Sequence, residues 1–256
     1  MKWLRVWRRK SILRNAHLDQ AAWRNTLALP IFAGLTPAEQ TQLADWVVLF
    51  LHDKTIFGAA GLEINDQVRF TIASQACLLI LNLDPDWYRG WSEIIVYPDQ
   101  FVPHREHIDE HGIVHESRYP MMGEAWLSGP VILSWADVAQ AGTLDGMNVV
   151  LHEFAHKLDM LNGDANGLPP LHEGMRVREW ADAFKVAYAD FCRRVDAGED
   201  TAIDPYASES PAEFFAVLTE IFFEAPGLLH VEYPLVYAQM RAFYRQDPLT
   251  RLGGQN

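Results

Sequence analysis

Two histidines four residues apart, with a glutamate directly after the first, are the residues of this chain best suited to chemistry. They are His152, Glu153 and His156, within the stretch NVVLHEFAHKLDMLNGD. On a helix such histidines lie about 40° apart around the axis and one turn apart along it, so both imidazoles can bind one ion. This HExxH pattern is typical of zinc peptidases that use the glutamate as base. The alternative is an ordinary solvated helix that carries these residues by chance.

The other residues of this stretch predict a helix with a buried back. Val150, Phe154, Leu158 and Leu161 lie on the arc opposite His152 and are expected to pack into the core. The Asn-Gly pair that follows this arc is a helix stop signal. The hydrophobic pattern therefore agrees with the metal-site interpretation.

A catalytic zinc site needs a third protein ligand and an open fourth position, where the pKa of a water molecule falls to about 7. The extended HExxHxxGxxH pattern is excluded, because Asp159 and Asn162 stand where it requires Gly and His. We predict that Glu213, near the start of a later helix, is the third ligand. The competing interpretation is that the run 210–213 is a capping box, in which this glutamate only binds the backbone.

Three other carboxylates are candidates for supporting roles. Asp159 projects near the metal face, where it can bind the ion or accept a hydrogen bond from a liganding imidazole. Glu220 shares a helix face with Glu213 and is the next candidate for a ligand or for such a hydrogen-bond partner. An aminopeptidase must also hold the amino terminus of its substrate, and Asp159, Glu220 and Glu124 are the candidates for that task.

The composition predicts one globular domain over residues 1–256, with residues 1–20 as a flexible N-terminal segment. The 34 acidic and 21 basic residues give a net charge of −13, which argues against direct binding of nucleic acid. No apolar run approaches the roughly 20 residues of a membrane span, so no membrane association is expected. Cys77 and Cys192 form no CxxC pair and no disulfide framework, which favours a cytoplasmic location.

The hydrophobic patterns predict an α+β fold. We expect it to be mostly helical, with a small mixed or antiparallel sheet packed against the HExxH helix, as in gluzincin peptidases. The predicted helices cover residues 40–51, 66–83, 177–194, 210–224 and 231–244, and the predicted strands cover 93–97 and 130–134.

The polar stretch 102–126 is expected to form a long hairpin or loop. It carries four histidines, which are His104, His107, His111 and His115. They favour a pH-sensitive loop near the active site over a second metal site.

Three ordered segments, HEFAHKLDMLNGD, DPYASESPAEFFAVLTEIFFEAP and FYRQDPLTRL, resemble the Mlc titration factor A family, and the likeness spans nearly the whole chain. That family is described as cytoplasmic zinc metallopeptidases with a catalytic region similar to the anthrax lethal factor protease domain. The resemblance implies that His152, His156 and Glu213 bind one Zn²⁺ and that Glu153 is the base. It also implies that Tyr206 stabilises the oxyanion. From the residues alone, Tyr206 reads as a buried loop aromatic.

The resemblance associates the chain with two functions. The first is zinc-dependent peptide hydrolysis, as an aminopeptidase. From the predicted strands we expect an extended peptide substrate to pair with a sheet edge at Val131–Leu133. The second is binding of the glucose-responsive repressor Mlc. The alternative to an enzyme is a non-catalytic protein that sequesters a transcription factor, with a structural or vestigial zinc site. A helix-rich domain without metal is the third hypothesis.

Overall fold

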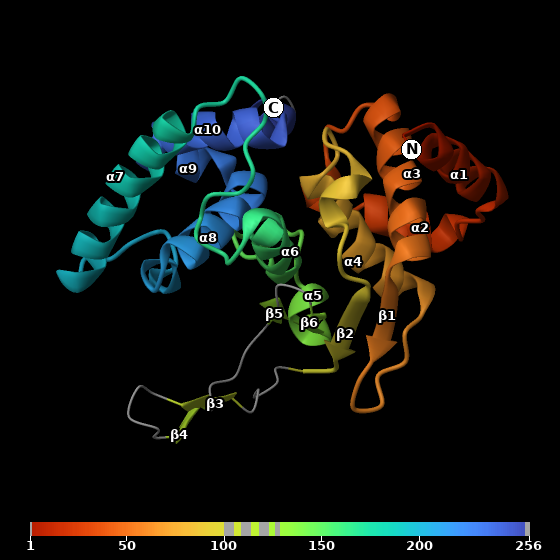
Figure 1. Cartoon of the computed structure of the whole chain (residues 1–256), viewed down its shortest axis with the longest axis horizontal. Helices are drawn as coiled ribbons and strands as arrows, with labels where there is room; N and C mark the ends of the chain where they lie inside the picture. Colours follow the sequence, from red (N-terminus) through yellow and green to blue (C-terminus); the bar gives the residue numbers. More distant parts are fainter. Residues whose placement is uncertain (1, 100–104, 109–113, 118–122, 126–128, 254–256) are drawn as a thin grey trace.

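Helices make up most of the fold, as the α+β prediction expected, and a small sheet lies beside them (Figure 1). The computed structural model describes residues 2–99, 105–108, 114–117, 123–125 and 129–253. The helices are α1 (Lys2–Asn15), α2 (Gln20–Leu27), α3 (Pro37–Asp53), α4 (Asp66–Leu79), α5 (Trp135–Val138), α6 (Val149–Asp159), α7 (Val177–Asp196), α8 (Pro211–Glu224), α9 (Pro226–Glu232), α10 (Pro234–Tyr244) and α11 (Pro248–Gly253). The strands are β1 (Thr55–Gly58), β2 (Glu93–Tyr97), β3 (Arg105–Ile108), β4 (Val114–Ser117), β5 (Gly123–Ala125) and β6 (Val131–Ser134).

The main sheet is mixed, in the order β1-β2-β6-β5. Strands β1, β2 and β6 are parallel, and β5 runs antiparallel to β6. The prediction that Val131–Leu133 form a sheet edge is wrong, because β6 pairs with β2 on one side and with β5 on the other. The edges of the described sheet are therefore β1, which is not among the predicted strands, and β5.

The predicted helices are present with three corrections. The helix expected over residues 66–83 ends at Leu79. The helix expected over residues 231–244 is divided into α9 and α10, since Pro234 has no N–H to continue the first helix and instead begins the second. Helix α6 ends at Asp159, so Leu161 lies beyond it and is 39% exposed instead of buried. Val150, Phe154 and Leu158 are fully buried, as predicted.

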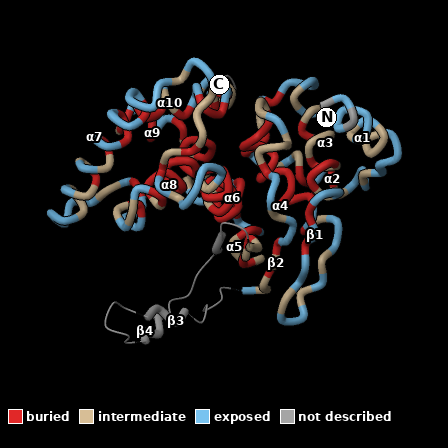
Figure 2. Tube along the Cα trace, viewed as in Figure 1, coloured by how far each residue is buried: buried red, intermediate tan, exposed pale blue. Residues whose placement is uncertain are grey.

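Helix α6 lies in the middle of the molecule. Figure 1 places it between a group formed by α7 to α10 and a group formed by α1 to α4, and it contacts α4, α8, β5 and β6. Figure 2 shows α6 and much of α8 as buried. Buried hydrophobic residues from both groups form a continuous cluster, which holds α6 from its back. Any site on the front of α6 thus rests on a well-packed element.

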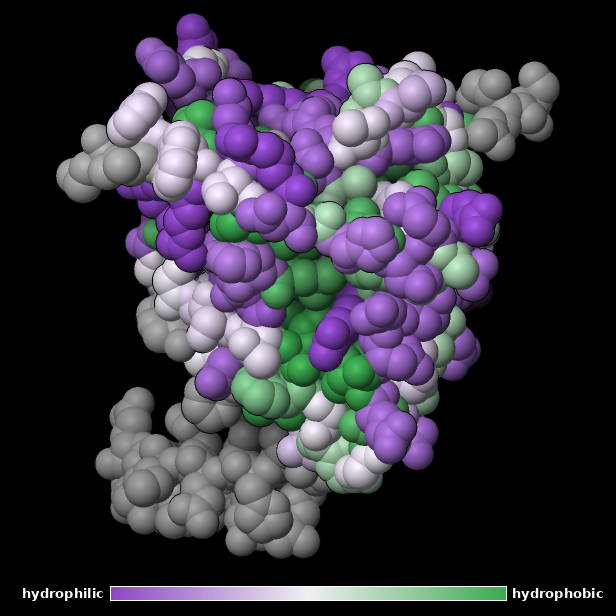
Figure 3. Space-filling view, turned by 90° about the vertical axis from the view of Figure 1, so that its right-hand side faces the viewer, coloured by the Kyte–Doolittle hydropathy of each residue, from purple (hydrophilic) through white to green (hydrophobic). Residues whose placement is uncertain are grey.

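The N-terminal segment contains α1, which packs on α3. Its Arg5 and Arg9 make ion pairs with Asp86, and Arg9 also pairs with Asp84. The flexibility of residues 1–20 stays a prediction. Figure 3 faces this side of the molecule and shows mostly hydrophilic residues around a hydrophobic strip.

The histidine-rich stretch includes the antiparallel pair β3 and β4, in which His107 stands opposite His115. His104 and His111 lie outside the described residues, so the interpretation of this stretch as a pH-sensitive loop stays a prediction. Cys77 and Cys192 are free thiols. Among the helices of the described residues, none has the length and apolar character needed to cross a membrane.

Candidate metal centre

The first turn of α6 is fixed by a side-chain cap. Asn148 precedes the helix, and its Oδ1 accepts a hydrogen bond from Leu151 N. Such a cap satisfies one of the backbone donors that every helix leaves unpaired at its start. Because the cap sets where the helix begins, it also sets which face carries His152 and His156.

The two histidines of α6 meet Glu213 of α8, 57 residues after His156 in the chain. Glu213 Oε2 lies 3.0 Å from His152 Nε2 and 3.3 Å from His156 Nε2, and the two Nε2 atoms are 3.3 Å apart. Helices α6 and α8 pack directly on each other, which brings these atoms together. The structure thus unites the three side chains that the sequence analysis proposed as ligands.

Glu213 is also part of a helix cap, but its carboxylate is not. Ser210 Oγ accepts a hydrogen bond from Glu213 N. In the complete capping box of α3, by contrast, the Glu39 carboxylate returns to Thr36 N at 2.8 Å. The carboxylate of Glu213 is turned to the histidines instead, so the backbone of this residue caps the helix while its side chain belongs to the cluster.

Glu220 fixes the orientation of His152. Its Oε1 lies 2.8 Å from His152 Nδ1, on the opposite side of the imidazole from Glu213, and its Oε2 accepts a hydrogen bond from Asn148 N at 2.5 Å. A carboxylate at this position holds a metal-binding imidazole in one orientation and one tautomer. Burial alone would lower the pKa of His152, but its hydrogen bonds to Glu213 and Glu220 raise that pKa well above its ordinary value.

Glu224, one helical turn beyond Glu220, anchors the start of α6 from the same face of α8. Its carboxylate accepts hydrogen bonds from Gly142 N, Leu144 N and Asn148 Nδ2. Burial raises its pKa and these hydrogen bonds lower it, with a net increase. The narrow arc of α8 that carries Glu213, Glu220 and Glu224 is visible in the sequence, but no role was assigned there to Glu224.

Asp159 is completely buried. In the recorded interactions its carboxylate accepts hydrogen bonds from a loop and not from an imidazole. Its Oδ2 accepts hydrogen bonds at 2.7 Å from Asn166 N and Gly167 N. Gly167 has a φ of +78°, and a Cβ there would lie 2.5 Å from Pro211 O. The loop therefore needs glycine at this point to lie against the start of α8.

Glu153 lies next to the cluster in a buried position and is 4% exposed. Its Oε2 has no hydrogen-bond partner among the described residues. Burial raises the pKa of Glu153 to about 7, against the lowering effect of the two neighbouring histidines. A carboxylate oxygen left without a partner beside three convergent donor atoms suits a group that exchanges protons with a bound molecule.

Tyr206 lies near His152 and is 38% exposed, not buried as the residues alone suggested. It belongs to the short 3-10 helix Pro205–Ser208, whose start is capped by Asp204, and this helix packs on α8. The centroid of its ring is 6.1 Å from that of His152. The side chain of Glu124 lies outside the described residues, so its proposed role stays a prediction.

The three donor atoms fit a small metal ion. Two imidazole nitrogens and one carboxylate oxygen all lie within 4.8 Å of one another. Ligands at about 2.0–2.1 Å from a tetrahedral ion are about 3.3 Å apart. The measured separations of 3.0 to 3.3 Å match this value.

Comparison with known proteins agrees with this geometry. The family described as glucose-regulated metallo-peptidase M90 matches residues 4–245. The chain belongs to this family. Its relatives include three proteins named Mlc titration factor A. That of Klebsiella pneumoniae is 40% identical over 235 residues, covering 90% of this chain and 88% of the relative. That of Escherichia fergusonii is 39% identical over 239 residues (91% and 89%), and that of Salmonella arizonae is 38% identical over 257 residues (98% and 99%).

Membership of the M90 family confirms the resemblance found in the sequence and agrees with a metal ion at this cluster. The family match spans α1 to α10, so it covers the elements that carry the two histidines, Glu213 and Tyr206.

Proposed function

We propose that the chain is a zinc-dependent peptidase whose ion is held by His152, His156 and Glu213. The observation that carries this proposal is the convergence of their three donor atoms next to the buried Glu153. Three protein ligands leave a position for water or substrate, whereas structural zinc sites are usually closed by four ligands. We also propose that residues 1–256 form one domain, since one hydrophobic cluster extends from Trp23 to Tyr244.

A zinc ion at this position supplies Lewis-acid chemistry, which polarises a peptide carbonyl and acidifies a water molecule. Glu153 would carry the proton, since its buried Oε2 without a recorded partner can accept a proton from the attacking water and deliver it to the leaving amine. Tyr206, whose ring centroid lies 6.1 Å from that of His152, would donate a hydrogen bond to the developing oxyanion. Glu220 holds His152 in place through Nδ1.

We further propose that the peptidase is an aminopeptidase and that it is located in the cytoplasm. Asp159 is buried under its loop, and Glu220 is occupied by His152 and Asn148, so neither carboxylate is free to receive a substrate amine in this structure. If the chain is an aminopeptidase, another group must therefore accept the hydrogen bonds of the substrate's amino terminus. Product analysis on peptides with free and acetylated amino termini tests it, because an aminopeptidase releases single residues only from the free ones.

Exchange of Glu153 for glutamine tests the catalytic proposal. Glu153→Gln should bind zinc within about threefold of wild type and lose about 10²- to 10⁴-fold in peptidase rate. Glu209→Gln, an exposed residue one position before the cap of α8, is the matched control and should keep the full rate. A zinc-loaded Glu153→Gln variant that retains the wild-type rate would refute the mechanism, as would wild-type protein without activity on any peptide of a defined mixture.

The second candidate function is capture of a repressor, which the names of the relatives favour, since they are Mlc titration factors. We propose that such binding does not require peptide hydrolysis. Pull-down of an Mlc-type repressor by wild type and by Glu153→Gln distinguishes the two functions. Equal capture by both proteins is the expected result, and capture lost only in the variant would contradict it.

A further inference from the structure

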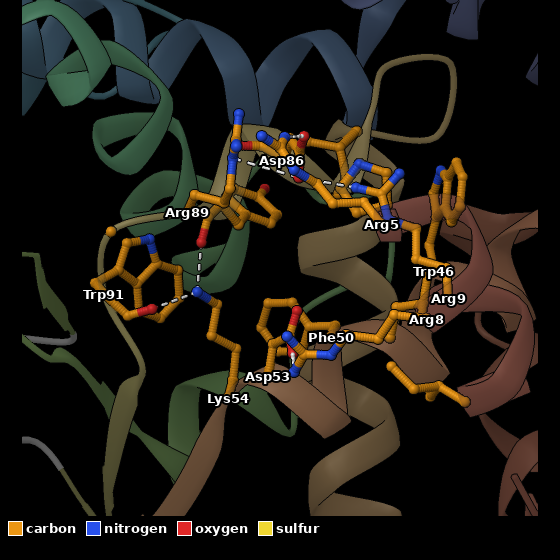
Figure 4. Close-up of a pocket in the computed structure, with 16 residues that line it drawn as sticks. Arg5, Arg8, Arg9, Trp46, Phe50, Asp53, Lys54, Asp86, Arg89 and Trp91 are labelled. Atoms are coloured by element: carbon orange, nitrogen blue, oxygen red, sulfur yellow. Dashed lines mark hydrogen bonds and ion pairs between the residues drawn. The ribbon is translucent and has the colours of Figure 1, made fainter. Parts of the chain in front are cut away.

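A cavity separate from the candidate metal centre lies between α1, α3 and the segment 85–91 (Figure 4). Its volume is about 410 Å³, and none of the three proposed zinc ligands lines it. This size lies within the range of small-molecule sites, which is about 300–1,000 Å³. The cavity joins a wall of aromatic rings to a rim of cations.

The aromatic wall consists of Trp46, Phe50, Tyr88 and Trp91. Phe50, Tyr88 and Trp91 pack edge to face on one another, with centroids 6.0 to 6.4 Å apart. All three also pack on Phe154 of α6 at 5.2 to 5.7 Å. The core holds Phe50 and Tyr88, which are only 5% and 3% exposed, so they form the floor of the wall before any ligand enters. The half-buried rings of Trp46 and Trp91 supply the accessible surface for a planar ring.

The rim carries more positive than negative charge. The lining cations are Arg5, Arg8, Arg9, Lys54 and Arg89, and the lining carboxylates are Asp53 and Asp86. Asp86 is shared by three guanidinium groups, at 2.8 Å from Arg5, 2.9 Å from Arg9 and 3.3 Å from Arg89. Even with Asp84, which pairs with Arg9 outside the lining, the cations remain in excess. In a chain of net charge −13, such an excess favours an anionic ligand.

Lys54 adds a buried cation at the wall of the cavity. It is 7% exposed, and its ammonium donates hydrogen bonds to the carbonyls of Tyr88 and Trp91. The same ammonium lies 3.8 Å from the centre of the Trp91 ring (Figure 4). No carboxylate of the described residues lies within ion-pair distance of it, and burial lowers its pKa to about 8. A nearby anion would compensate this charge.

We propose that this cavity binds a nucleoside monophosphate, with the base against the aromatic wall and the phosphate against the arginine rim. Guanidinium groups pair with phosphate through two parallel hydrogen bonds, and aromatic rings stack on nucleobases of any kind. A phosphate without a base would leave the accessible ring surface of Trp46 and Trp91 in water, and a base without a phosphate would leave the excess cations uncompensated. The observations therefore favour both groups on one molecule.

Calorimetric titration of the full chain with adenosine monophosphate, adenosine and ribose 5-phosphate tests the proposal. The nucleotide should bind saturably and at least about tenfold more tightly than either fragment, because only it contacts both parts of the cavity. Absence of binding by the nucleotide, or equal binding by ribose 5-phosphate, would overturn the proposal. Neither result depends on peptidase activity.

Substitutions at the rim make the test specific. Arg8→Gln should weaken nucleotide binding about tenfold, since Arg8 is exposed and makes only one long ion pair, 3.7 Å from Asp53. Arg14→Gln, on the same helix but outside the lining, is the control and should change nothing. Asp53→Asn removes a lining carboxylate and should tighten binding about threefold. Misfolding cannot produce such a gain, so unchanged or weaker binding by Asp53→Asn would contradict the proposal.

Discussion

Replacement of Glu220 by glutamine should separate metal binding from helix anchoring. Glu220 accepts one hydrogen bond from His152 Nδ1 at 2.8 Å and another from Asn148 N. Glutamine keeps one acceptor oxygen but loses the negative charge and the second acceptor. Loss of such a partner typically weakens metal affinity 10- to 100-fold, equivalent to about 1.4–2.7 kcal/mol. We therefore expect Glu220→Gln to bind zinc 10- to 100-fold more weakly than wild type.

Glu224→Gln is the matched control for this experiment. Glu224 lies one turn further along α8, is 2% exposed, and also accepts a hydrogen bond from Asn148, but it contacts neither histidine in the recorded interactions. Both variants should therefore lower the free energy of unfolding, whereas zinc affinity should change less than about threefold in Glu224→Gln. Competition with a chromogenic chelator measures the affinities, and urea unfolding of the metal-free proteins measures stability. Equal zinc affinities of the two variants would refute the reasoning.

Two further predictions concern the packing behind the site. Phe154→Ala should lower the free energy of unfolding by about 3–5 kcal/mol, because the ring is fully buried against three other aromatic rings. Urea unfolding measures this change, and a loss below about 1 kcal/mol would contradict the prediction. Lys54 has a pKa of about 8 in the folded chain, below its ordinary value of 10.5, so the unfolded chain binds more protons between these pH values. Stability from this group should therefore rise with pH over that window, and the stability of wild type relative to Lys54→Met should increase from pH 7.5 to 10. A difference independent of pH would contradict this prediction.

Some strands and helices could be predicted from local sequence patterns alone, and others could not. Strand β2 and helices α7 and α8 agree with the predicted ranges within two residues. The helices were predictable because their hydrophobic pattern repeats over many residues, and the strand because it is rich in β-branched residues. Strand β1 was missed because its four residues, TIFG, carry too short a pattern, and its partner strand begins 38 residues later at Glu93. The division between α9 and α10 could have been predicted from Pro234, because proline lacks the N–H that would continue the hydrogen-bond pattern of the first helix.

The order of the sheet could not be predicted from local patterns. Val131–Leu133 are apolar enough for either an edge or an interior strand, and only the pairing of β6 with both β2 and β5 places them inside. Strand order depends on contacts between distant segments, whereas hydrophobic alternation reports only which face of a strand is buried.

In the candidate site, too, some features follow from local sequence and others depend on contacts between distant segments. The sequence determined that His152, Glu153 and His156 share the front of a helix whose back is Val150, Phe154 and Leu158, because a helical period depends only on residues within a few positions of one another.

Only the tertiary structure shows where the carboxylate of Glu213 lies. The local pattern allowed a capping box, and Ser210 does cap the helix, but the packing of α8 on α6 turns the carboxylate to the histidines. The partners of Glu220, Glu224 and Asp159 were decided in the same way. Each is set by which backbone and side-chain donors the fold brings within hydrogen-bond reach, and no spacing along the chain encodes that distance.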